Sequence, residues 1–320
     1  MTLGVAYHTA RVLHPEGGWY ITTQNGNEIY SALSTFFGSF RMPAFFLLAG
    51  FFSALLLAKL GPYNYLRQRL LRIAVPLIAC GLTLQLFVRR DYNWDTNFWI
   101  EGAWVGHLWF LIHLLIYMIF AAISFSLING RGREIRILYF PIFVALLFMI
   151  ASFFAWRLPE LPFIKSRLFF PYLVFFIAGM YLQITPRLLT LFHNWRLNLL
   201  YLATGALVIL LFWESQSGLR FFGYGLWAIS MAGLLLYGTQ KIINKGNSAT
   251  KFLGDSSYTV YLFHEPLIIV IGSYLLFLNP HLFFASFSIG VTLLCWFLHA
   301  FFINRSSALS FIYNGRPWRW

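Results

Sequence analysis

Four ionisable side chains lie inside runs of apolar residues that are long enough to cross a bilayer: Arg41, His107, His264 and Glu265. A charge left in the hydrocarbon costs roughly 2.5–3.5 kcal/mol on insertion scales, so such residues usually face a protein interior and mark a function. Histidine, with an ordinary pKa of about 6.5, is suited to take a proton from a hydroxyl. Arginine is suited to hold an anion through two parallel hydrogen bonds.

The composition places these residues in a membrane protein. Of 320 residues, 59% are hydrophobic and only 10% are charged, whereas soluble domains are about 45–50% apolar. The net charge of +13 falls mainly between the apolar segments, so we expect a lipid bilayer as partner and no nucleic acid. Cys80 and Cys295 lie within apolar segments, which predicts neither a disulfide framework nor a metal site.

A spanning helix needs about 20 mostly apolar residues, and this criterion predicts an all-α, polytopic protein of about ten transmembrane helices. Nine full helices are expected near 32–58, 73–88, 105–128, 136–156, 168–185, 197–213, 220–239, 257–278 and 282–303. The first 14 residues resemble the second half of a tenth helix, truncated at Met1. We expect a single transmembrane domain over 1–304 and a short tail over 305–320.

The basic residues of the loops predict the orientation. One set of loops holds 15 Lys and Arg residues and two acidic ones: 59–72, 129–136, 186–196, 240–255 and 305–320. The alternate loops, around 11–31, 89–104, 157–167 and 214–220, hold seven of each sign. The first set should face the cytoplasm. Both chain termini are then cytoplasmic, in a multi-pass protein of a bacterial inner membrane.

This orientation brings three candidate residues toward the outer half of the membrane. His8 lies near the outer end of the first apolar segment, Arg41 follows the start of the second, and His107 begins the helix near 105–128. A histidine near a helix end is commonly just interfacial. An interfacial position explains Arg41 less well, since apolar residues flank it on both sides. We expect Arg41 to pair with an acid, an acceptor or a substrate.

The helix near 257–278 carries a second polar group. Ser257, Tyr261 and His264 are spaced i, i+4 and i+7 and so share one helical face. Pro266 lacks an N–H and is expected to bend the helix there. Two interpretations stay open: a hydrogen-bond network that braces the kink, or part of a substrate site.

Two loops could contact ligands. Arg67, Arg69 and Arg72 lie at the predicted cytoplasmic mouth, where they either grip phosphates or serve as positive-inside anchors. The loop RRDYNWDTNFWIEGAW around 89–104 is rich in tryptophan. Sugar rings stack on such side chains, but tryptophan is also common at membrane interfaces.

Five stretches together resemble the acyltransferase 3 family of ten-helix membrane acyltransferases, especially its periplasmic-glucan succinyltransferase branch. They are LGVAYH ending at His8, FRMPAFFLLAGFFS over 40–53, RQRLLRIAVP over 67–76, GHLWFL from 106 and SYTVYLFHEP over 257–266. The family's first helix carries an arginine ten residues before the histidine that matches His8. That arginine would precede Met1, so we expect the true start to lie upstream.

The resemblance implies an O-acyltransferase that moves a succinyl or acetyl group from cytoplasmic acyl-coenzyme A to a hydroxyl of a periplasmic or cell-surface glycan. His8 would be the general base or a transient acyl carrier. Arg41 and His107 would stabilise the oxyanion, or Arg41 would hold a succinyl carboxylate. No bound cofactor or metal is implied.

The donor would occupy the cytoplasmic side. Arg67, Arg69 and Arg72 would bind the coenzyme A phosphates, while Ser257, Tyr261 and His264 would line the passage for its pantetheine arm. A rival interpretation is a transporter or flippase for glycans or lipid-linked sugars, because buried charges and a proline-broken helix are also typical of transporters. Against it, the sequence shows no repeated half.

Overall fold

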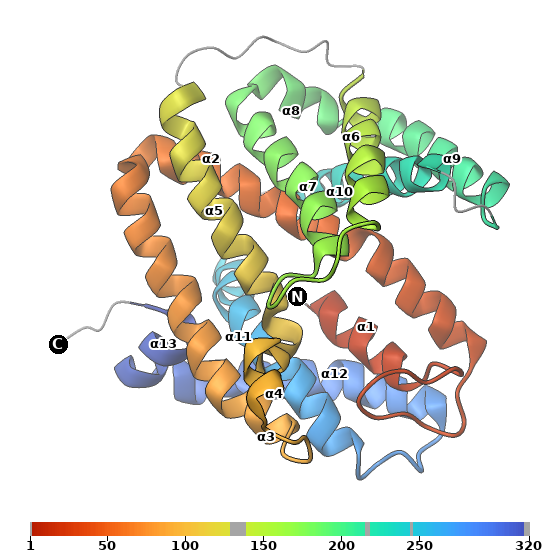
Figure 1. Ribbon diagram of the computed structural model, residues 1–320, viewed down its shortest axis with the longest axis vertical. Helices are drawn as coiled ribbons and strands as arrows, with labels where there is room; N and C mark the ends of the chain where they lie inside the picture. Colours follow the sequence, from red (N-terminus) through yellow and green to blue (C-terminus); the bar gives the residue numbers. More distant parts are fainter. Residues whose placement is uncertain (1, 129–138, 215–217, 244–245, 317–320) are drawn as a thin grey trace. The chain divides into compact units, whose positions relative to one another are not determined.

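The computed structural model describes residues 2–128, 139–214, 218–243 and 246–316, and throughout these residues the fold is all-helical. The elements are α1 (Thr2–Val12), α2 (Glu28–Cys80), η1 (Gly81–Gln85), α3 (Leu86–Val88), α4 (Thr96–Ile100), η2 (Ala103–Leu108), α5 (Trp109–Ile128), α6 (Phe140–Ala155), α7 (Ser166–Ile184), α8 (Pro186–Phe192), α9 (Trp195–Leu211), α10 (Gly218–Ile242), α11 (Ser248–Gly272), α12 (Pro280–Leu298), η4 (His299–Ile303) and α13 (Ser307–Asn314) (Figure 1). The predicted all-α class is confirmed.

Five helical stretches in the described part of the chain are long and apolar enough to cross a membrane. They are Glu28–Val88, Thr96–Phe125, Ser166–Ile184, Gly218–Ile242 and Pro280–Ile303. Two further apolar helices, α6 and α9, are shorter. The chain is therefore multi-pass, while the count of ten spans and the cytoplasmic termini stay predictions. The predicted inner loop 129–136, and with it the start of the helix expected over 136–156, lies outside the described residues.

The connection expected as a loop over 59–72 is helical instead. Helix α2 runs from Glu28 to Cys80 and is interrupted only at Gly61, with φ 72° and ψ 163°. Only glycine reaches this conformation without strain, so Gly61 redirects the helix without a long loop. The prediction is wrong because the Arg and Gln residues after Gly61 favour helix well, so their polarity does not mark a loop.

Helix α11 begins nine residues before the expected start at 257. Asn247 caps it: its side chain accepts a hydrogen bond from the Thr250 N–H, and the Thr250 hydroxyl accepts one from the Asn247 N–H. This reciprocal pair satisfies backbone donors that the first helical turn would leave free. The apolar run marked the middle of the helix, while the capping residues set its beginning.

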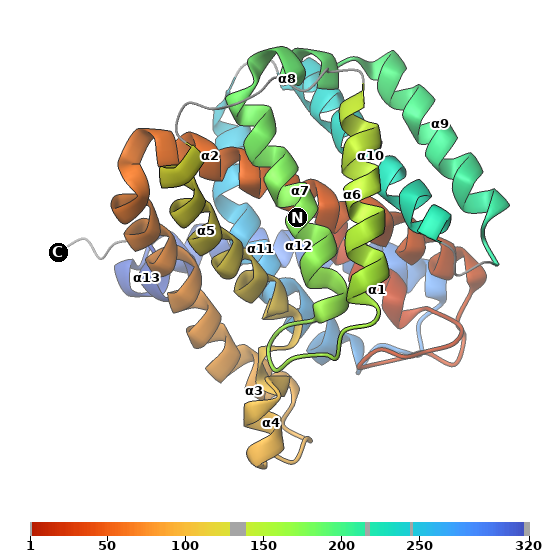
Figure 2. The same cartoon turned by 45° about the horizontal axis from the view of Figure 1, so that its top comes forward.

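The chain forms two compact units. The first comprises Met1–Gly38, Leu70–Leu111 and Gly246–Trp320, and the second Ser39–Arg69 and Ile112–Lys245. In the first unit, α1, α11 and α12 enclose an apolar core that includes Val5, Ile268 and Phe287. In the second unit, α10 packs against α9 and α6, and α6 packs against α7 (Figure 2). The first unit carries the polar cluster described below.

Glycines allow close helix packing in the second unit. A Cβ added at Gly179 in α7 would lie within 3.0 Å of the Leu47 carbonyl of α2, and one at Gly50 would meet the Phe176 carbonyl in the same way. Without a hydrophobic force to drive them together in lipid, membrane helices associate through such small residues, which let backbones approach. The two glycines thus hold α2 against α7.

We expect Gly179→Ala to destabilise the protein by about 1–3 kcal/mol, because the added methyl group meets backbone that cannot move aside cheaply. The midpoint of thermal unfolding in detergent measures the change. Gly290→Ala in α12 is the matched control, since no described atom beyond its own helical turns lies within 4 Å of the added Cβ, and alanine is the better helix former. Equal midpoints for the two variants would contradict the role of Gly179.

Candidate active site

Helix α11 brings two buried ionisable residues into the first unit. His264 and Glu265 are each only 3% exposed. The His264 Nδ1 lies 2.8 Å from both the Val260 and Tyr261 carbonyl oxygens of its own helix. Because carbonyls only accept hydrogen bonds, Nδ1 carries the proton, and Nε2 of the neutral ring carries the lone pair. His264 therefore has one defined tautomer when neutral.

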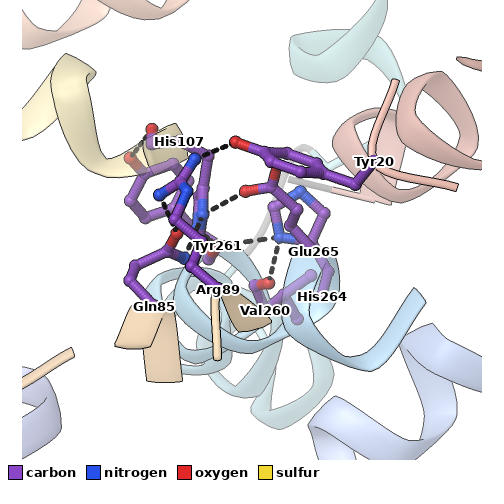
Figure 3. Close-up of polar contacts among 8 residues, drawn as sticks. All are labelled: Tyr20, Gln85, Arg89, His107, Val260, Tyr261, His264 and Glu265. Atoms are coloured by element: carbon purple, nitrogen blue, oxygen red, sulfur yellow. Dashed lines mark hydrogen bonds and ion pairs between the residues drawn. The ribbon is translucent and has the colours of Figure 1, made fainter. Parts of the chain in front are cut away.

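His107 meets α11 from a tight turn. Its Nδ1 contacts the Glu265 carboxylate, and its Nε2 lies 3.2 Å from the Tyr261 carbonyl (Figure 3). The Tyr261 hydroxyl donates back to the His107 carbonyl over 3.0 Å. Gly106 makes this turn possible: its φ is 55°, and a Cβ there would collide with the Gln85 and Arg89 side chains. The backbone before His107 therefore requires glycine.

Gln85 and Arg89 extend the cluster from the π-helix η1 and the residues after it. The Gln85 Nε2 lies 2.8 Å from the His107 Nδ1, and Arg89 donates to the Gln85 Oε1 over 3.1 Å. Both side chains are buried, at 1% and 6% exposure. Arg89 thereby orients the Gln85 amide and adds a positive charge to the network that contains the buried Glu265 carboxylate (Figure 3).

Tyr20 joins the same network from the loop between α1 and α2. Arg89 donates a second hydrogen bond to its hydroxyl (Figure 3), and the Arg89 guanidinium lies 5.1 Å from its ring centre. Although the Tyr20 residue is 37% exposed overall, desolvation of its phenol and the nearby negative charge of Glu265 raise its pKa to about 12, while Arg89 opposes the shift. The phenol therefore stays protonated at physiological pH.

His8 completes a row of three imidazoles. Its ring centre lies 5.1 Å from that of His264, which in turn lies 5.7 Å from that of His107. His8 is half-buried in α1 and also contacts the Trp19 ring at 5.5 Å. Three chain segments thus place three histidines in a row, and His107 at one end of the row contacts the Glu265 carboxylate. This arrangement is suited to general acid–base chemistry.

The structure brings four of the nine predicted site residues together: His8, His107, Tyr261 and His264. Ser257 lies one turn before Tyr261 in α11 and is half-buried, and its hydroxyl donates to the Gly254 carbonyl over 2.7 Å. The remaining four are the predicted arginines: Arg41, Arg67 and Arg69 of the second unit, and Arg72, which is exposed in the first. The roles of these arginines stay predictions.

Sequence reasoning missed Gln85, Arg89 and Tyr20, and assigned no role to Glu265. Glu265 gave a signal, because it is an acid inside an apolar run. Gln85 gave a weaker signal, because it is a polar amide within the apolar helix predicted over 73–88. Arg89 looked like an ordinary loop charge beside Arg90. Among the described residues, no group of three or more His, Cys, Asp or Glu side chains is arranged to hold a metal ion.

We expect Arg89→Gln to lower the free energy of unfolding by about 1–3 kcal/mol, because it leaves buried partners without their donor. Arg90→Gln should change it by less than about 1 kcal/mol, since Arg90 is half exposed and pairs with the exposed Asp91 at 3.9 Å, and exposed ion pairs contribute little. Thermal unfolding of both variants in detergent checks the difference. A smaller effect at Arg89 than at Arg90 would contradict the structural role of the network.

Comparisons with known proteins agree with the sequence motifs. The model of the acyltransferase 3 family, described as "Acyltransferase domain", matches residues 1–300. The chain is similar to "Glucans biosynthesis protein C" of Escherichia coli O17:K52:H18 (strain UMN026 / ExPEC) and of Escherichia coli (strain K12). Each is 23% identical to it, over 99% of this chain and 92% of the relative. No solved structure matches it. The predicted resemblance is confirmed: the chain belongs to the acyltransferase 3 family and is an O-acyltransferase.

Proposed function

We propose that this enzyme transfers a succinyl or acetyl group from cytoplasmic acyl-coenzyme A to a hydroxyl of a periplasmic or cell-surface glycan, at the bacterial inner membrane. The family supports the acyl transfer, and the name of the relatives, which refers to glucans, supports the acceptor. The observation that carries the proposal is the row of His8, His264 and His107 beside Glu265. Such a cluster can accept the proton that a sugar hydroxyl must lose.

In this mechanism His8 takes the hydroxyl proton as the sugar oxygen attacks the thioester carbon. The new C–O bond forms, the C–S bond breaks, and the proton passes to the departing thiolate to give free coenzyme A. His8 is the best placed of the three imidazoles for this step, since it is half-buried while His107 and His264 are nearly closed off. A transient acyl group on His8 is the alternative route to the same products.

His107 would stabilise the developing oxyanion. It would act through the positive charge of its protonated ring, because both of its N–H groups would already donate, one to the Glu265 carboxylate and one to the Tyr261 carbonyl. Arg41 would hold the acyl carbonyl or a succinyl carboxylate. Arg67, Arg69 and Arg72 would receive the coenzyme A phosphates. Ser257, Tyr261 and His264 would line the pantetheine passage, with Tyr261 and His264 nearest the reaction.

Membranes that contain the protein, supplied with labelled acyl-coenzyme A and a glucan, test the proposal. We expect label in an alkali-labile ester on the glucan, and the mass difference between treated and untreated glucan names the acyl group. Movement of glucan across vesicles without any esterified label would favour a transporter instead and would overturn the proposal.

We expect His8→Ala to lower the rate of acyl transfer by 10²–10⁴-fold, roughly the contribution of a general base. The assay is ester formation on the glucan, with folding checked by thermal unfolding. His281→Ala is the control, because His281 is exposed and pairs with the Tyr30 hydroxyl away from the cluster. Full activity of the His8 variant would remove His8 from the mechanism.

We expect Glu265→Gln to reduce kcat by at least about tenfold, because the amide keeps the shape of the side chain but carries no charge to balance a protonated His107. The KM for each substrate should change little. Glu101→Gln, at an exposed acid before the same turn, should leave both constants unchanged. An unaltered kcat in the Glu265 variant would show that the carboxylate is structural.

A further inference from the structure

The loop between α1 and α2 folds back along α1 and is tied down at several points. The Thr23 N–H donates to the Val12 carbonyl over 3.3 Å, and the Asn27 N–H donates to the Leu13 carbonyl over 3.1 Å. The Thr23 hydroxyl also reaches the Leu276 carbonyl at 3.4 Å. The loop is therefore held against the first unit by both its backbone and its side chains.

Trp19 lies in this loop directly beside the candidate base. Its ring centre is 5.5 Å from that of His8, with 32° between the planes. Part of its surface packs against the apolar core of the first unit, and the side chain is half-buried. Within the described residues, its indole N–H makes no hydrogen bond and is not enclosed. Trp19 thus offers a supported aromatic ring and an unused donor.

Tyr20 fixes this arrangement. Its ring lies 5.6 Å from that of Trp19, and its hydroxyl accepts a hydrogen bond from Arg89 (Figure 3). Arg89 also donates to Gln85, and the Gln85 amide contacts His107, so a chain of polar contacts links Tyr20 to His107. The loop that carries Trp19 is therefore anchored to the polar cluster that surrounds the reaction.

We propose that Trp19 is the binding platform for the acceptor, a pyranose ring that stacks its apolar C–H face on the indole and presents a hydroxyl to His8. The indole N–H would donate to a sugar oxygen at the edge of the ring. A flat, amphipathic side chain that is already held in place binds with little loss of entropy. This inference rests on the proposed function in assigning His8 to the acceptor hydroxyl.

The tryptophans of the loop around 89–104 have structural partners instead. Trp94 donates its indole N–H to the Arg89 carbonyl over 3.0 Å. Trp104 covers Gly81 so closely that a Cβ there would collide with its ring. Trp99 contacts the rings of Phe98 and Trp104 at 5.4 and 6.4 Å. These contacts explain the aromatic character of that loop without a sugar.

Trp19→Ala and Trp19→Phe, made in the full chain, test the platform. With a glucose oligosaccharide as acceptor, Trp19→Ala should raise the acceptor KM about tenfold, equivalent to about 1.4 kcal/mol. The Phe variant keeps an aromatic face and should show a smaller rise. The KM for acyl-coenzyme A should not change in either variant. Trp99→Phe is the control and should leave the acceptor KM unaltered.

Calorimetric binding of the same oligosaccharide without donor separates this inference from the proposed function. We expect binding to weaken in the Trp19 variants and to persist in His8→Ala. Failure of the wild-type protein to bind the oligosaccharide would overturn the platform. An unchanged acceptor KM in Trp19→Phe would also overturn the platform, and this variant provides the test if Trp19→Ala does not fold. Binding without acyl transfer would instead overturn the proposed function.

Discussion

The buried contact between Glu265 and His107 constrains everything around it. A carboxylate that is 3% exposed costs several kcal/mol unless charge and hydrogen bonds compensate it. His107 contacts it directly, and Arg89 provides a full positive charge in the same network. Because these three residues come from separate parts of the chain, the first unit must bring α11, the turn at η2 and the residue after α3 together to keep the carboxylate stable.

The need to compensate the buried Glu265 carboxylate explains two irregular features of the backbone, at η1 and at Gly106. The π-helix η1 carries Gln85 toward His107, and π-helical turns inside longer helices are frequent at functional sites. Gly106 adopts a conformation that leaves room for the Gln85 and Arg89 side chains. Arg89 and Arg90 are neighbours of one residue type, yet one is buried in the network and the other half exposed. Their difference in exposure follows from their positions on the turn, since the two side chains are chemically identical.

The polar network both stabilises the first unit and positions the groups of the proposed mechanism. Residues such as Gln85 and Arg89 touch no substrate in the proposed mechanism, but they orient His107 through hydrogen bonds, as outer partners do around many catalytic groups. His8 stands at the more open end of the row, next to Trp19. A site that is closed and charged at one end and aromatic at the other is suited to a polar acceptor that must be held while a proton moves.

The sequence by itself determined the membrane class and the helical fold, and it singled out His107, His264 and Glu265 as ionisable residues within apolar runs. Hydropathy and helix length are local properties, and a charge inside an apolar run stands out wherever it occurs. Local reasoning failed at 59–72, where one glycine bends a continuous helix. Only the tertiary structure decided which residues meet. The Tyr261–His107 contact spans 154 positions, and Tyr20, Gln85 and Arg89 acquire their roles through packing between segments that no local pattern records.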